Sequence, residues 1–301
     1  LSQSFQVLTE YTNESDYSIY SEVMKSHQRS SIGNSTVEDY MLRYYNKPNS
    51  FKGYLYVSQI LQAYGVSMGM EAHRRNKGYS MGSLYWQLND CWPVASWSSI
   101  DYFGKWKALH YSTKKAFQPV LISFFKSDSE IELHIISDLL ESKDVDLNLK
   151  VLSFSGEVLY EINKKYLLQQ NSTIKAESLS IEWLNKNFDP NSSLLVASLF
   201  SNEIEISNNN YYLSEFKDIK LMKPLIEYKI VELINTFEVS LTSKNLVKNV
   251  FVDIDSNQNF SDNYFDIIPG EVYKISIKKD QSLTLDDIKR KINFLSLFDT
   301  Y

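Results

Sequence analysis

The residues of this chain that are best suited to chemistry lie in the segment 85–111. Four of the five tryptophans fall there, and amide and acidic side chains are interleaved with them: Trp86, Gln87, Asn89, Asp90, Trp92, Trp97 and Trp106. An indole can stack on the apolar C–H face of a sugar ring, while amide and carboxylate groups bond the sugar hydroxyls. The pattern therefore indicates a carbohydrate pocket. The plainer interpretation is a local core that buries several tryptophans.

A buried strand followed by a long loop is expected to position these side chains. The stretch 83–88 is short, aromatic and apolar on both faces, as in a strand of a parallel sheet. Helical spacing of apolar residues predicts a helix over about 54–75, and a second helix is expected over 105–117, before Pro119. Helix, strand, loop, helix is the order of an α/β unit. In (β/α)8 barrels the active site lies at the C-terminal ends of such strands.

Beyond Pro119 the apolar residues mostly alternate, which is typical of antiparallel strands. Strands are expected around 131–135, 145–151, 195–199, 237–241, 250–254 and 273–277. Clusters of turn-forming residues at 208–210 and 255–263 separate strands, and the polar stretch 215–224 predicts a link between two β-sandwiches. His134, on an alternating strand, is expected to be an ordinary surface residue.

Composition excludes several classes of function. The 301 residues carry a net charge of −6 and no run of Lys or Arg, so neither nucleic acid nor a membrane surface is an expected partner. No apolar run approaches the roughly 20 residues of a membrane-spanning helix. One cysteine and four widely spaced histidines give no metal-ligand pattern, so no metal or other cofactor is expected. Leu1 is not preceded by Met or followed by a signal sequence, which suggests processing or the tail of a longer protein.

The segment Met81-Gly-Ser-Leu-Tyr-Trp-Gln-Leu-Asn-Asp90, with Trp92, Trp97 and Gly104-Lys-Trp-Lys-Ala-Leu-His-Tyr111, resembles β-mannosidases of glycoside hydrolase family two. The resemblance continues weakly along the chain, where 261–263 and the ending 298–301 are similar to the last immunoglobulin-like domain of the lysosomal type. It implies a multidomain α/β plus all-β fold: the C-terminal end of a (β/α)8 barrel over 1–117, then immunoglobulin-like β-sandwiches over 118–218 and 219–301. A complete barrel needs about 250 residues, so the barrel end is expected to be incomplete.

The resemblance also implies retaining hydrolysis of terminal non-reducing β-D-mannose residues in oligosaccharides and glycoproteins. Such enzymes use two carboxylates, one as acid/base and one as nucleophile. By the same resemblance both precede Leu1, so this chain alone is expected to be inactive and to contain no catalytic residue. Trp86 corresponds to the family's aromatic residue in the sugar pocket. The other substrate-binding candidates at the pocket rim are Asn89, Asp90, Trp92 and Trp97.

Two alternatives stay open. The chain can be a noncatalytic tandem β-sandwich protein for binding or scaffolding, with a vestigial barrel end, or another family-two exo-glycosidase with a different sugar preference. Lysosomal or secreted placement follows only from the resemblance. Five Asn-x-Ser/Thr sequons, about as many as chance predicts, are weak candidates for glycosylation: Asn13, Asn34, Asn171, Asn191 and Asn259.

Overall fold

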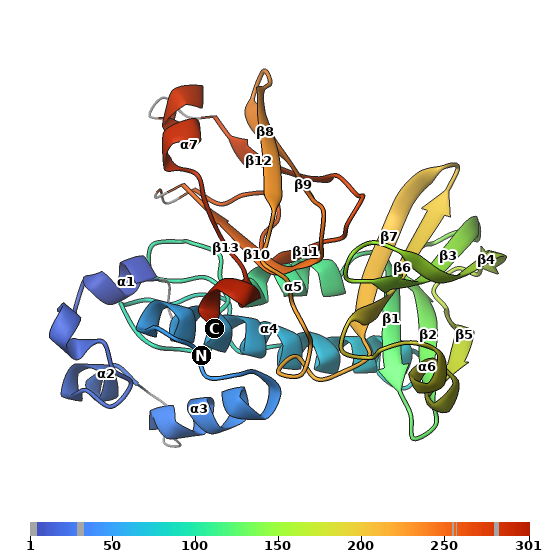
Figure 1. The fold of residues 1–301 in the computed structure, drawn as a ribbon, viewed down its shortest axis with the longest axis horizontal. Helices are drawn as coiled ribbons and strands as arrows, with labels where there is room; N and C mark the ends of the chain where they lie inside the picture. The colour runs from blue at the N-terminus through green and yellow to red at the C-terminus, as the bar shows by residue number, and fades with distance from the viewer. Residues whose placement is uncertain (1–4, 29–32, 255, 257, 280–282) are drawn as a thin grey trace. The chain divides into compact units, whose positions relative to one another are not determined.

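The computed structural model describes residues 5–28, 33–254, 256, 258–279 and 283–301 (Figure 1). The chain forms two compact units. The first contains Leu1–Val66, Tyr85–Ser112 and Leu221–Tyr301, and the second contains Ser67–Leu84 and Thr113–Lys220. The fold is a helical N-terminal region followed by two immunoglobulin-like β-sandwich domains.

Helices dominate the chain up to residue 116. They are α1 (Phe5–Thr9), η1 (Glu14–Asp16), α2 (Glu22–Ser26), α3 (Gly33–Tyr44), α4 (Phe51–Arg75) and α5 (Ala108–Ala116). The helix predicted over 54–75 is confirmed by α4. Its stripe of apolar residues runs from fully buried Val57 to half-exposed Met68. Three basic residues in its last turn face the negative end of the helix dipole.

Two predicted elements of this region differ from the structure. Residues 83–88 do not form a buried strand: their side chains include Leu84, which is 103% exposed. A strand needs hydrogen-bond partners, and in the described residues the backbone of this stretch meets only Ser99 and Ile100. The helix expected from 105 begins at Ala108, because Lys105 and Lys107 use their backbone in pairing with 99–101 instead.

The first sandwich lies within the second unit. One sheet has the order β1–β2–β5 and the other β4–β3–β6–β7, with all neighbours antiparallel. The strands are β1 (Val120–Lys126), β2 (Glu130–Ser137), β3 (Lys143–Ser153), β4 (Val158–Leu168), β5 (Thr173–Ser180), β6 (Ser193–Ser201) and β7 (Ile204–Tyr212), with α6 (Ile181–Asn187) between β5 and β6. Inward residues of both sheets, such as Leu133, Leu147 and Leu199, share one core. The strands predicted at 131–135, 145–151 and 195–199 are confirmed.

The asparagines at 208–210 are not a turn, as their composition predicted, but part of β7. Their amides take partners that let polar residues stay in a sheet: Lys115 Nζ lies 3.1 Å from Asn208 Oδ1, and Asn209 Nδ2 donates to the Ile122 carbonyl at 2.9 Å. His134 is half-buried on β2, where Nε2 lies 2.8 Å from Glu132 Oε2.

The second sandwich lies within the first unit. Its sheets have the orders β12–β9–β8 and β11–β10–β13. The strands are β8 (Ile226–Glu232), β9 (Thr236–Ser243), β10 (Val247–Asp253), β11 (Phe265–Ile267), β12 (Tyr273–Lys278) and β13 (Asn293–Leu295), with α7 (Leu285–Lys291) and η2 (Leu297–Thr300). The strands predicted at 237–241, 250–254 and 273–277 are confirmed, and Val239, Val252 and Ile275 meet in their core. Of the turn cluster at 255–263, Asp255 and Asn257 lie outside the described residues.

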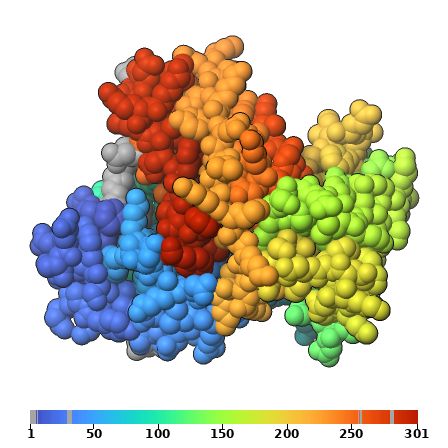
Figure 2. Space-filling view, in the orientation of Figure 1, coloured from blue at the N-terminus to red at the C-terminus, as the bar shows by residue number. Residues whose placement is uncertain are grey.

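The helical region and the second sandwich pack together in the first unit. Tyr56 on α4 donates its phenol hydrogen to the Asn249 carbonyl, and the Tyr264 hydroxyl lies 3.2 Å from Gln59 Oε1. The end of the chain adds a third contact, since the Asn49 N–H donates to the Thr300 carbonyl at 2.8 Å. Figure 2 shows this terminal segment in red, adjoining the light-blue surface of the helices.

The buried phenols at this junction predict a loss of stability in alkaline solution. Burial raises the pKa of Tyr45, Tyr56 and Tyr264 well above the usual value of about 10. A raised folded-state pKa contributes stability that is fully present below the unfolded value and is lost as pH rises through the folded value. Urea unfolding from about pH 8 to about pH 11 should therefore show a falling free energy of unfolding. The Y56F variant should fall less steeply; an identical slope would contradict the assignment.

Candidate functional site

The loop that follows residue 85 is held by a small backbone ladder. Ile100 pairs in parallel with Asn89 and antiparallel with Trp106. The Ile100 N–H donates to the Leu88 carbonyl at 2.8 Å, and the Asp90 N–H donates to the Ile100 carbonyl at 3.1 Å. The residues after Trp86 are therefore fixed through their backbone, although the segment is neither helix nor regular strand.

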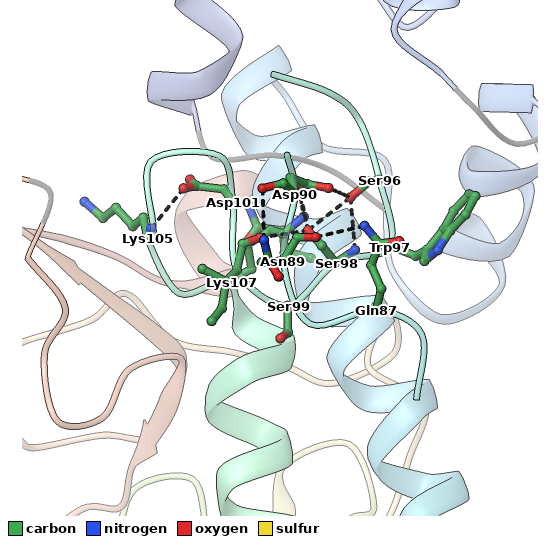
Figure 3. Close-up of polar contacts among 12 residues, drawn as sticks. Gln87, Asn89, Asp90, Ser96, Trp97, Ser98, Ser99, Asp101, Lys105 and Lys107 are labelled. Carbon is green, nitrogen blue, oxygen red and sulfur yellow. Dashed lines mark hydrogen bonds and ion pairs between the residues drawn. The ribbon is translucent and has the colours of Figure 1, made fainter. Parts of the chain in front are cut away.

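Asp90 lies inside this loop, with its side chain only 2% exposed. Ser96 Oγ donates to Asp90 Oδ1 and Ser98 Oγ donates to Asp90 Oδ2, both at 2.6 Å (Figure 3). The hydroxyls of the two serines are 3.0 Å apart. Both carboxylate oxygens are thus occupied by the loop's own hydroxyls, and the Asp90 carboxylate is buried inside the loop.

Lys107 completes this buried cluster. Its side chain is 1% exposed, and its Nζ lies 3.5 Å from Asp90 Oδ2. Burial lowers the pKa of the Lys107 ammonium, and the negative charges of Asp90 and Asp101 oppose that shift. A buried lysine beside a buried aspartate forms an ion pair that depends on both partners.

In contrast to Asp90 and Lys107, Trp86 and Asn89 are exposed to solvent. Trp86 is 75% exposed, and Asn89 is also exposed. The peptide bond between Trp86 and Gln87 is cis. An indole and an amide therefore stand at the surface of a fixed backbone, the two side-chain types expected to contact a sugar.

The two remaining candidates are half-buried. The Trp92 ring stacks on His27 at 4.9 Å between centroids, and His27 in turn stacks on Tyr11 at 3.7 Å. Figure 3 shows the indole of Trp97 turned away from Asp90. Its Nε1 is buried with no hydrogen-bond partner in the described part of the chain, while its carbonyl accepts from Gln62 Nε2 at 2.8 Å. The five predicted residues thus share one loop, but Asp90 points into it.

The acids of this loop do not form a facing catalytic pair. Asp101 Oδ1 accepts from the backbone N–H groups of Phe103 and Lys105, at 3.0 and 2.9 Å. Like Asp90, it is committed to holding the loop. In the described residues no group of three or more His, Cys, Asp or Glu could hold a metal ion. Within the same residues, none of the helices is both long and apolar enough to cross a membrane.

The sequons differ in how their amides are used. Asn13 and Asn171 are exposed. Asn34 Nδ2 donates to the Ile19 carbonyl at 2.8 Å, and Asn259 Nδ2 donates to the Gly104 carbonyl at 3.0 Å. Asn191 Oδ1 accepts from Ser214 Oγ at 2.6 Å. Asn13 and Asn171 are therefore the most accessible of the five candidates.

Sequence reasoning missed the residues that hold the loop, above all Ser96, Ser98, Lys107 and Asn259. The alternation Ser96-Trp-Ser98 and the pair of lysines in Gly104-Lys-Trp-Lys107 were the available signals. Neither of these two sequence signals indicates by itself that Ser96, Ser98 and Lys107 contact Asp90.

Two family models match the sandwiches. Residues 129–218 match a model described as a mannosidase Ig/CBM-like domain, and residues 221–300 match an Ig-fold domain. The fold and these matches define a multidomain protein with paired immunoglobulin-like domains of the mannosidase type.

Whole-chain comparisons extend the match to the helical region. The β-mannosidase of Capra hircus is 30% identical over 99% of this chain and 36% of its own length, and that of Bos taurus is 28% identical over the same shares. The crystal structure of β-D-mannosidase from Dictyoglomus thermophilum has a TM-score of 0.88 at 25% identity, covering 98% of this chain and 36% of that one. The chain is thus a relative of the C-terminal region of β-mannosidases and spans about 36% of these curated relatives. The resemblance inferred from the tryptophan segment is confirmed.

A more distant structure shares the fold alone. The exo-chitosanase of Amycolatopsis orientalis has a TM-score of 0.77 at 16% identity, over 99% of this chain and 40% of that one.

Proposed function

We propose that this chain is the C-terminal part of a retaining exo-β-mannosidase acting on terminal non-reducing β-D-mannose residues of oligosaccharides and glycoproteins. The observation that carries the proposal is the 75% exposure of Trp86 on a backbone fixed by the Ile100 ladder. An apolar ring on a rigid support is what stacking beneath a sugar requires. Similarity to β-mannosidases supplies the substrate class. By the same similarity we propose a lysosomal or secreted location.

The barrel end over 1–117 is part of this proposal. Leu84, Trp86 and Leu88 alternate along the chain and are 103%, 75% and 55% exposed. Large apolar side chains so exposed favour a surface that packs against the portion of β-mannosidases that this chain does not span.

In the proposed enzyme the residues of this chain bind and orient the substrate. Trp86 stacks beneath the sugar, and the Asn89 amide bonds a hydroxyl. Trp92 and Trp97 lie at the rim, where their half-buried rings support the pocket. Asp90, with both oxygens occupied, holds the loop rather than touching sugar. The acid/base and the nucleophile, about 5–5.5 Å apart in retaining enzymes, are proposed to lie before Leu1.

The assay that tests this proposal compares the 301-residue chain with the protein extended by the upstream reading frame. With 4-nitrophenyl β-D-mannoside we expect no turnover by the chain alone and turnover by the extended protein. Normal turnover by the isolated chain would refute the placement of the carboxylates. An extended protein that prefers β-glucosaminides or β-galactosides would instead support the alternative of another family-two exo-glycosidase with a different sugar preference.

A noncatalytic binding or scaffold protein is the second candidate. A groove of about 540 Å³ on the outer face of β3, β4 and β6 favours it, because this groove could hold a ligand away from the tryptophan loop. Asn148, Asn163 and Phe200 line the groove, and none of the five predicted sugar-pocket residues does. The transcript upstream of the Leu1 codon separates the two functions. A start codon adjacent to it favours the binding protein; a continuing frame with a Glu shortly before Leu1 favours the enzyme.

A further inference from the structure

We infer that Asn259, in the last immunoglobulin-like domain, is a positioning residue for the tryptophan loop and for that reason is not a glycan acceptor in the folded protein. The inference rests on the proposed function of the loop. Asn259 Oδ1 accepts the backbone N–H of Trp106 at 2.8 Å, and Asn259 Nδ2 donates to the Gly104 carbonyl at 3.0 Å. The amide of Asn259 thus forms hydrogen bonds with the loop backbone at two positions, and two bonds fix the loop more firmly than one would.

Consecutive backbone pairings connect the Asn259 contact with the segment that carries Trp86. Trp106 pairs with Ile100, and Ile100 pairs with Asn89. The Ile100 N–H also donates to the Leu88 carbonyl at 2.8 Å, two residues from Trp86. Each link is a main-chain bond, so the position of residue 106 sets the position of the segment that carries the exposed indole.

The turn at 101–105 presents the backbone that Asn259 binds. The Gly104 N–H donates to the Asp101 carbonyl at 3.0 Å, and Gly104 has a φ of +83°, which favours glycine. The next residue anchors the turn to the same domain: Lys105 Nζ lies 2.6 Å from Asp253 Oδ1. Because the Lys105 side chain is only 13% exposed, this ion pair is screened less than a surface pair.

The same geometry conflicts with modification of the sequon Asn259-Phe260-Ser261. A glycan would be attached at Nδ2, the atom that lies 3.0 Å from the Gly104 carbonyl. N-linked glycans are bulky and need surface space. Loop docking and glycosylation of Asn259 therefore exclude one another.

Three variants test the inference. N259A removes both bonds to the loop, whereas N259D keeps an oxygen that can accept from Trp106 and loses the donor to Gly104. S261A is the control: it destroys the sequon and leaves the Asn259 amide unchanged. The Ser261 hydroxyl accepts the Ser276 N–H at 2.9 Å, a bond to β12 rather than to the loop. Acrylamide quenching of tryptophan fluorescence is measured on the 301-residue chain, well below the melting temperature.

We expect N259A to raise the quenching of the loop tryptophans, N259D to give an intermediate value, and S261A to match the parent chain. In the extended protein, N259A should lower kcat/KM about tenfold, mainly through KM, as the loss of positioning bonds implies. A merely structural role would lower the melting temperature and leave quenching and KM unchanged, and that result would overturn the inference. Quenching needs no catalysis, so it remains decisive even where the extended protein hydrolyses no β-mannoside and the proposed function fails.

The modification arm uses the extended protein from a secretory host. Peptide mass spectrometry should find Asn259 unmodified in the folded protein. The peptide that contains Asn259 should therefore differ in mass between the parent protein and S261A only by the Ser-to-Ala substitution. A glycan on Asn259 in folded, loop-docked protein would overturn the inference directly.

Discussion

Replacing Lys107 with methionine is expected to lower the free energy of unfolding of the first unit by about 3–5 kcal/mol, because the Asp90 charge is then buried without its partner. The Asp90 side chain is 2% exposed, and Lys107 Nζ is the cation beside it at 3.5 Å. The hydroxyls of Ser96 and Ser98 bond the carboxylate but do not neutralise it. Urea denaturation followed by tryptophan fluorescence measures the effect, since four of the five tryptophans lie in this unit.

The matched control for this prediction is the double variant D90N/K107M. Removing both charges leaves no uncompensated ion, so most of the stability lost in K107M should return. A double-mutant cycle then isolates the coupling between the two residues. A K107M variant as stable as the parent chain would show that the carboxylate finds solvent or another partner, and the buried cluster would lose its assigned role.

This cluster also shows why the candidate site was only partly predictable from the sequence. Asp90 directly follows the tryptophan-bearing stretch, so its position along the chain suggested a sugar contact. The structure turns it inward, because Ser96 and Ser98 return after Pro93 to meet both its oxygens. A loop that folds back on itself in this way shows no regular spacing of apolar residues in the sequence, and no single residue type marks it. Its geometry emerges only when the whole loop closes.

The fold was more predictable where burial imposes a period. On β3, Val145, Leu147 and Leu149 are buried at every second position, which is the alternation visible in the sequence. On β4 most side chains are exposed, so no apolar period marks this strand. On β7 the three asparagines resemble a turn until Lys115 and the edge of β1 supply their partners. Strands stabilised by neighbours rather than by their own apolar residues escape pattern recognition.

Contacts distant in sequence were the least predictable. Asn259 and Trp106 are 153 positions apart, and only the tertiary fold places the amide over the loop backbone. In the sequence Asn259 is visible solely as part of a weak sequon. The same residue type can carry a glycan or bond backbone groups, and only the tertiary contacts of its amide decide which.

Substituting alanine for Trp86 in the extended enzyme is expected to lower kcat/KM for β-mannosides about 100-fold, since the apolar and ring contacts with a sugar are worth about 2–3 kcal/mol. The loss should appear with little change in the stability of the 301-residue chain, because 75% of the Trp86 surface makes no contact there. Steady-state kinetics on the extended protein and thermal unfolding of the chain measure the two quantities separately. W86F keeps an apolar ring and should recover part of the activity.

Tyr102→Ala provides the matched control for that loss. Tyr102 is an aromatic residue of the same loop and is 46% exposed, but it lies in the turn at 101–105 rather than beside Asn89. We expect its removal to leave kcat/KM near that of the parent enzyme. Unchanged kinetics in W86A would contradict the sugar pocket. A large drop in the melting temperature of the W86A chain would show that the indole packs against protein, and the tryptophans would then form a local core.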